Sequence, residues 1–101
     1  MANSQTSMVY KKIHLKIGGQ RTTININIYL TALFLRKRTG KKVDPLRLSD
    51  TNVSTAKVLI QREIDLKNAD ERKVVYLKRR LKERVEEFLI NEIADPKLLT
   101  Q

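Results

Sequence analysis

Four polar side chains recur at every second position of one short segment, namely Arg21, Thr23, Asn25 and Asn27. In an extended strand, such residues share one face. Arginine can bond guanine bidentately, asparagine can bond adenine bidentately, and threonine can bond either base or touch a thymine methyl group. The segment therefore predicts a strand whose polar face contacts base edges in a groove of duplex DNA. Asn27 has a second interpretation, because it also stands where it could cap the helix that follows.

The residues between these positions must hold the strand in place. Ile24, Ile26 and Ile28 alternate with them and predict a buried face. A partial alternation over Val9–Ile17 predicts another strand, and Gly18-Gly19 predicts a turn between the two. A plain β-hairpin of 9–17 with 21–28, in an α+β domain without base contacts, is the alternative that this pattern leaves open.

Helical patterns fill the rest of the chain. Residues 28–39 are apolar nearly all round and end before Gly40, so we expect a helix that needs cover on more than one side, which favours a partner subunit. A second helix is expected over 54–67, capped by Ser54 or Asn52. An amphipathic helix is expected over 71–93, packed on the domain or on a dimer mate, or docking another protein.

Charge and composition narrow the function classes. The 101 residues include 21 Lys and Arg against 11 Asp and Glu, a formal charge of +10, which attracts polyanions such as DNA, RNA or an anionic membrane. The longest unbroken apolar run, 32–35, is too short for a membrane span, and the polar N-terminus lacks a signal-peptide layout. A cytoplasmic, nucleoid-associated protein is expected.

Catalytic sets are missing from the sequence. It has no cysteine and a single histidine, His14, which lacks a second metal ligand nearby. Gly18-Gly19 is a bare pair and not a phosphate-binding loop, and the acidic residues lie on charged helix faces. We therefore expect a binding protein without catalytic residues, metal or cofactor.

The order strand, helix, loop, helix resembles the ribbon-helix-helix family of DNA-binding proteins over roughly residues 20–66. The matching stretches are Arg-Thr-Thr-Ile-Asn-Ile-Asn-Ile at 21–28, the apolar helix after it, and Val-Ser-Thr-Ala at 53–56. The chain departs from the family pattern in two places. A further strand-like segment precedes the motif, and Tyr29 stands near the place where the family often has a proline.

The resemblance implies a mainly α fold with a short β-ribbon, in an intertwined homodimer with an extra N-terminal strand and a C-terminal amphipathic helix. Two subunits would pair their strands antiparallel, and the ribbon would enter the major groove, with a pseudo-palindromic site following from the two-fold symmetry. The second helix would direct its N-terminus, with Ser54 and Thr55, at a phosphate. The domain would span 9–67, after a tail at 1–8 and before a C-terminal helix and tail at 68–101.

Further basic residues add candidate phosphate contacts. Lys12 and Lys16 would lie beside the ribbon, although they could equally protect an edge strand. Lys41 and Lys42 follow Arg-Lys-Arg at 36–38. Together these five basic residues either bind phosphates or form a solvated helix end that complements the helix dipole.

The predicted function is sequence-specific binding of double-stranded DNA, most simply as a transcriptional repressor that occupies its site. One alternative on the same fold is a plasmid or phage maintenance factor: a centromere-binding partition adaptor, a relaxosome accessory protein or an antitoxin. Another is a basic RNA-binding protein, although the strand face has no aromatic platform for stacking bases. The expected partners are duplex DNA, a second copy of the chain with possible higher-order assembly on DNA, and a protein at the C-terminal helix.

Overall fold

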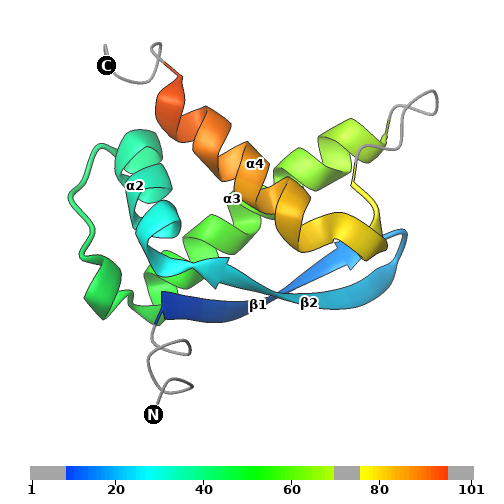
Figure 1. Cartoon of the computed structure of the whole chain (residues 1–101), viewed down its shortest axis with the longest axis horizontal. Coiled ribbons are helices and arrows are strands. Elements are labelled where there is room, and N and C mark those ends of the chain that lie inside the picture. Colours follow the sequence, from blue (N-terminus) through cyan, green and yellow to red (C-terminus); the bar gives the residue numbers. More distant parts are fainter. Residues whose placement is uncertain (1–8, 70–75, 96–101) are drawn as a thin grey trace.

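The computed structural model describes residues 9–69 and 76–95. A β-hairpin comes first, followed by helices that gather on one side of it (Figure 1). The elements in chain order are β1 (Tyr10–Ile17), β2 (Gln20–Asn27), α2 (Ile28–Thr39), the 3-10 turn η1 (Pro45–Arg47), α3 (Asp50–Asn68), the 3-10 turn η2 (Lys78–Arg80) and α4 (Leu81–Ala94).

The two strands pair antiparallel along their whole length, in the register Tyr10 with Asn27 through Ile17 with Gln20. Gly18 and Gly19 form the two-residue connection, and both have positive φ, 58° and 80°. Tight hairpin turns of this length favour glycine at both central positions because a Cβ strains that backbone. Both predicted strands and the turn are thus confirmed.

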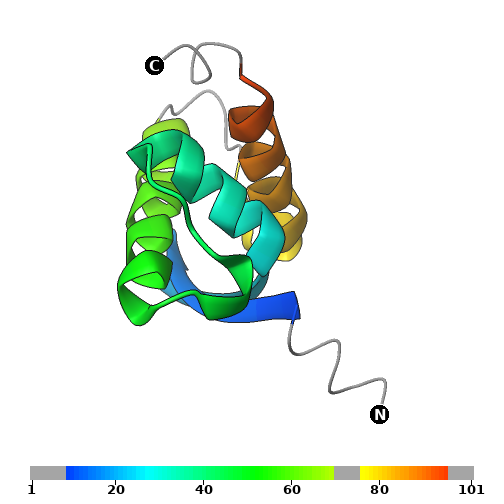
Figure 2. The ribbon, with the colours of Figure 1, turned by 90° about the vertical axis from the view of Figure 1, so that its left-hand side faces the viewer.

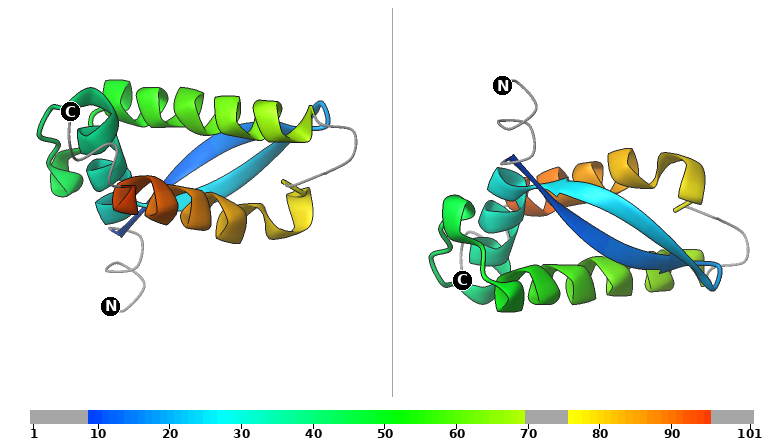
Figure 3. Two further views of the ribbon diagram at one scale, coloured as in Figure 1. Left: turned by 90° about the horizontal axis from the view of Figure 1, so that it is seen from above. Right: turned by 90° about the horizontal axis from the view of Figure 1, so that it is seen from below.

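The hairpin has one buried face and one open face. Ile13, Leu15, Ile24 and Ile26 point to the side of the helices and are at most 7% exposed. Seen from below, the ribbon lies in front of the described helices, so none of the helices in residues 9–69 and 76–95 covers its other face (Figure 3). The alternation in the sequence predicted this division of faces correctly.

Helix α2 has the predicted bounds. The Asn27 side chain accepts hydrogen bonds from the Tyr29 and Leu30 amides, and Gly40, in the left-handed region with φ 75°, ends the helix. Phe34 and Leu35 are buried within the chain because α3 and α4 pack against this helix. The expectation that α2 needs a partner subunit for its burial is therefore wrong: α3 and α4 of the same chain provide that cover.

Helix α3 begins four residues earlier than predicted, at Asp50. Neither Ser54 nor Asn52 is its cap; the Ser49 hydroxyl is, and it accepts from the Asn52 amide at 3.1 Å. The Asp-Thr-Asn segment at 50–52, which precedes the predicted start, forms the first turn, where short polar residues are well tolerated. The buried stripe of Ala56, Ile60 and Ile64 has the expected helical spacing.

The C-terminal helix is shorter than predicted. Residues 70–75 lie outside the described ranges, Lys78–Arg80 form η2, and the α-helix spans Leu81–Ala94. Its buried side chains Leu81, Val85 and Leu89 share one core cluster with the hairpin isoleucines. The rings of Phe34 of α2 and Phe88 of α4 pack edge-to-face with their centroids 5.6 Å apart, and Arg38 forms an ion pair with Glu92. The helix thus packs on its own domain, one of the two packings expected for it.

The ribbon exists within a single chain. The family resemblance implies pairing between strands of two subunits, whereas β2 pairs here with β1 of the same chain. A second subunit that paired with β2 would have to use the edge of β2 opposite to β1.

Candidate nucleic-acid interface

The open face of the hairpin, called the ribbon face below, carries three cross-strand pairs of polar residues. They are Lys12 with Asn25, His14 with Thr23, and Lys16 with Arg21. All except the half-buried His14 are exposed. Three of the predicted base-contacting residues, Arg21, Thr23 and Asn25, therefore share this face with two predicted phosphate-binding residues, Lys12 and Lys16.

The Lys16–Arg21 pair places two positive charges directly across the hairpin. Like charges opposite each other destabilise an antiparallel pair. An anion bound between them would relieve the repulsion, so this end of the ribbon is electrostatically suited to a phosphate or to the acceptor atoms of a guanine.

His14 lies at the centre of the ribbon face. Its Nδ1 is 2.7 Å from the Thr23 hydroxyl oxygen. Partial desolvation, together with the positive charges of Arg21, Lys57 and Lys12, lowers the pKa of His14 below its usual 6.5. At neutral pH the imidazole is therefore uncharged and can share a hydrogen bond with Thr23.

Asn27 is occupied as a helix cap. Its Oδ1 accepts from two backbone amides, at 2.9 Å from Tyr29 N and 3.1 Å from Leu30 N. Bidentate contact with adenine needs both the oxygen and the nitrogen of the side chain. The structure thus assigns Asn27 the capping role and removes it from the base-contacting set.

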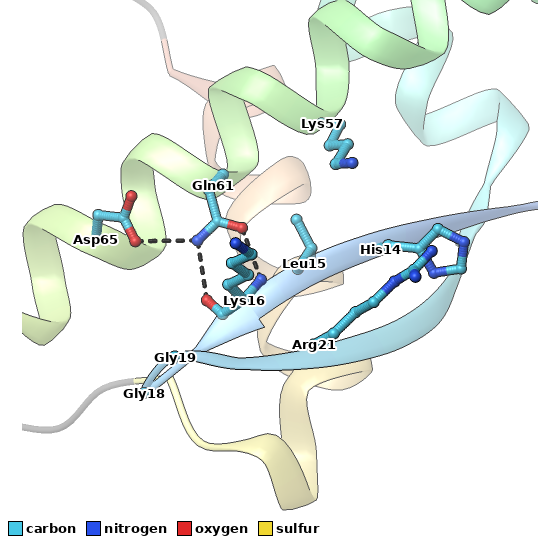
Figure 4. A pocket seen from close by; sticks show the side chains of 9 residues that line it. All are labelled: His14, Leu15, Lys16, Gly18, Gly19, Arg21, Lys57, Gln61 and Asp65. Atoms are coloured by element: carbon cyan, nitrogen blue, oxygen red, sulfur yellow. Dashed lines mark hydrogen bonds between the residues drawn. The ribbon is translucent and has the colours of Figure 1, made fainter.

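A pocket of about 530 Å³ borders the ribbon face where β1 lies next to α3. The Gln61 side chain accepts from the Lys16 amide at 2.8 Å and donates to the Lys16 carbonyl at 2.9 Å, and it also donates to Asp65 (Figure 4). These bonds satisfy the outer edge of β1 at this residue as a neighbouring strand would.

Lys57 is a basic residue of this region that the sequence did not single out. It reaches from α3 towards β1 and lines the same pocket as His14, Lys16 and Arg21 (Figure 4). In sequence it is one charge on an amphipathic helix. Its place beside the ribbon depends on how α3 packs against β1, which periodicity does not reveal.

Ser54 and Thr55 do not lie at a helix N-terminus. Because α3 starts at Asp50, both residues are in its second turn, where backbone amides bond within the helix. The Thr55 hydroxyl donates to the Thr51 carbonyl at 2.9 Å. The predicted phosphate contact through their backbone N–H groups is therefore wrong, and the acidic Asp50 in the first turn disfavours an anion there.

Lys41 and Lys42 are exposed but lie away from the ribbon face. They follow α2, which starts next to the ribbon and leads to the opposite side of the molecule (Figure 1). A helix of 12 residues is about 18 Å long. The structure therefore does not bring these two lysines together with Lys12 and Lys16.

The excess positive charge lies in the first part of the chain. Residues 1–43 contain nine Lys and Arg and no Asp or Glu, whereas residues 44–101 contain twelve basic and eleven acidic residues. Neither strand carries an acidic residue. The ribbon face itself therefore carries only basic and neutral side chains.

Within the described ranges, no cluster of three or more His, Asp or Glu side chains could hold a metal ion. None of the helices described there is long and apolar enough to cross a membrane. No protein-family model, curated protein or solved structure matches the chain.

Proposed function

We propose that this protein binds double-stranded DNA by placing the ribbon face in the major groove. The observation that carries the proposal is the composition of that face: cationic and base-bonding side chains stand on one open side of a hairpin whose other side is packed. The major groove is wide enough for a two-stranded ribbon. Because β1 and β2 form this ribbon in one chain, each subunit would bring a complete ribbon to the duplex.

In this arrangement Arg21, Thr23 and Asn25 contact base edges. They alternate along β2 on the open face and are exposed. Lys12 and Lys16 on β1, with Lys57 from α3, contact the flanking phosphates. Base contacts of this kind confer sequence preference, and phosphate contacts confer affinity that falls with salt. A protein that occupies a defined site excludes others from it, so repression of transcription is the regulatory outcome that we propose.

The test is selection of bound sequences from a random duplex pool, with Arg21→Ala and Asn25→Ala beside the wild type. We expect one enriched motif, and each variant should lose about 1–3 kcal/mol of discrimination at one position of it. Arg62→Ala is the matched control because it removes the same charge from an exposed site on α3 outside the ribbon face; it should keep the motif.

Three results would count against the proposal. If no duplex sequence is enriched, the protein does not recognise a specific DNA sequence. Variants that select the wild-type motif unchanged would place the base contacts elsewhere. Tighter binding to a competing structured RNA than to duplex DNA would favour the RNA-binding alternative.

A further inference from the structure

A second cationic surface lies at the end of α2. It consists of Arg36, Lys37, Lys41 and Lys42, and we call it the α2-end patch. Three of these side chains are exposed and Lys37 is half-buried. With the ribbon face, it accounts for most of the uncompensated charge of the chain.

The two cationic surfaces lie on opposite sides of the molecule. Helix α2 leaves the ribbon at Ile28 and rises away from it, so Gly40 lies at the end of the helix far from the hairpin (Figures 1 and 2). A duplex bound to the ribbon face is separated from the patch by the hairpin and by the length of α2, about 18 Å. The two surfaces are therefore separate candidate contacts for DNA.

The fold itself uses little of the patch charge. The neighbouring Arg38 is held by Glu92 of α4 and also lies over the Phe34 ring, 5.7 Å from its centroid. No ion pair to the four patch residues is found in the described part of the chain. Asp44, the nearest acidic residue in sequence, uses its side chain to accept from the Leu46 amide.

Complementing the helix dipole does not account for the whole patch. That effect falls off within the last turn of a helix, whereas Lys41 and Lys42 lie beyond the C-cap Gly40. Moreover, α4 ends with no basic residue in its last turn, so this fold does not depend on such charges to end a helix.

We propose that the α2-end patch binds the phosphates of a second duplex, so that one molecule holds two DNA segments at once. This inference rests on the proposed DNA binding by the ribbon face. Lys and Arg are the only side chains with which the patch can bind DNA. The neighbouring Thr39 hydroxyl is already hydrogen-bonded to the Leu35 carbonyl and the Lys41 amide. The second contact is therefore independent of sequence, because cations alone recognise the regular array of phosphates.

The test is a two-duplex capture. The site selected by the ribbon is fixed to beads, the protein is added, and a labelled duplex of unrelated sequence is then supplied. The variant replaces all four patch residues by glutamine: Arg36→Gln, Lys37→Gln, Lys41→Gln and Lys42→Gln. We expect its affinity for the fixed site to fall by less than about 3-fold and capture of the labelled duplex to fall by at least about 10-fold.

Two controls make the result specific. Lys41→Arg with Lys42→Arg keeps the charge and should keep capture. Lys12→Gln with Arg21→Gln should weaken binding to the fixed site itself; if it binds like the wild type, the proposed function fails. The circular dichroism spectrum of each variant checks that it is folded.

Three outcomes overturn the inference while leaving the ribbon proposal intact. If the glutamine variant captures the second duplex like the wild type, the patch is a solvated helix end. If it loses the fixed site as severely as the ribbon variant, both surfaces belong to one continuous footprint. If a labelled RNA duplex is captured more strongly than DNA, the patch serves a different nucleic acid.

Discussion

His14 and its neighbours show how single residues tune the ribbon face. The imidazole lies opposite Thr23 and near three positive charges that lower its pKa. The alternation of β2 placed Arg21, Thr23 and Asn25 on one face from sequence alone, since a period of two fixes sidedness. The His14–Thr23 contact and the nearness of Lys57 could not be predicted, because they depend on strand register and on the packing of α3.

The positive charge of Lys57 on α3 contributes to the lowered pKa of His14. Lys57→Gln removes one of the charges that disfavour the imidazolium ion, so the pKa should rise towards 6.5. NMR titration of the ring protons measures this directly. Arg62→Gln, with the same loss of charge on α3, is the control and should shift the pKa less.

In the wild-type protein, DNA binding should raise the lowered pKa of His14, because nearby phosphates favour the charged ring. Binding should therefore take up a proton, and affinity should increase as pH falls through the pKa of the complex and level off below the pKa of the free protein. The same lowered pKa acts on stability in the opposite sense: its contribution is present above pH 6.5 and is lost as pH falls through the folded pKa. An affinity that does not change with pH would show that His14 is remote from the phosphates.

At the scale of elements, polar side chains of α3 hold neighbouring segments by their backbone. Gln61 bonds the Lys16 amide and carbonyl, and Asn68 bonds the Tyr76 amide and carbonyl at 3.0 and 2.8 Å. The sequence predicted both strands, the turn between them and both ends of α2 because glycines and a capping asparagine mark them, but it left the pairing of the two strands in one hairpin as an alternative. It misplaced the start of α3 because several capping residues occur in succession from Ser49 to Ser54, and only the fold selects among them.

Asn68→Ala should lower the free energy of unfolding by about 1–3 kcal/mol, because it leaves two partly buried backbone groups of Tyr76 without partners. Denaturant unfolding measures the change. Asn91→Ala, at an exposed site on α4, is the control and should stay within about 0.5 kcal/mol of the wild type. Equal stability of the two variants would show that the Asn68 bonds do not hold Tyr76 in solution.

Gly19→Ala should destabilise the hairpin through the backbone alone. Gly19 has a φ of 80°, and an added Cβ would meet no atom within 4 Å, so no clash contributes. The left-handed conformation costs a non-glycine residue about 1–2 kcal/mol. Thermal unfolding should show this loss for Gly19→Ala and little change for Gln20→Ala, the exposed neighbour. A variant as stable as the wild type would mean that the turn can adopt another form.

In the whole molecule, the surfaces that carry the excess positive charge are separate from the surfaces that pack in the core. The helices and the inner hairpin face form the core, and the excess charge remains on the ribbon face and the α2-end patch. Fold class was partly predictable from sequence: a β-ribbon with helices is correct, and the extra N-terminal strand completes the ribbon within the chain. Assembly into a homodimer stays a prediction, because β1 already fills the place that the family resemblance gives to a second subunit.

Salt dependence should report the phosphate contacts of the ribbon. Log affinity for a single duplex should fall linearly with log salt concentration, and Lys12→Gln should reduce the steepness by about 1. Lys67→Gln, which removes an exposed lysine from the end of α3, is the matched control and should leave the slope unchanged. Equal slopes for all three proteins would mean that Lys12 contacts no phosphate.

We propose that the ribbon face is the surface that contacts DNA, and amide NMR shifts of the labelled protein test this proposal most directly. On addition of less than one equivalent of a short duplex, we expect the largest shifts at residues 12–16 and 21–25 and at Lys57. Signals of α4 should move little. Largest shifts on α4 or on the outer side of α3, with the hairpin signals unchanged, would contradict the account.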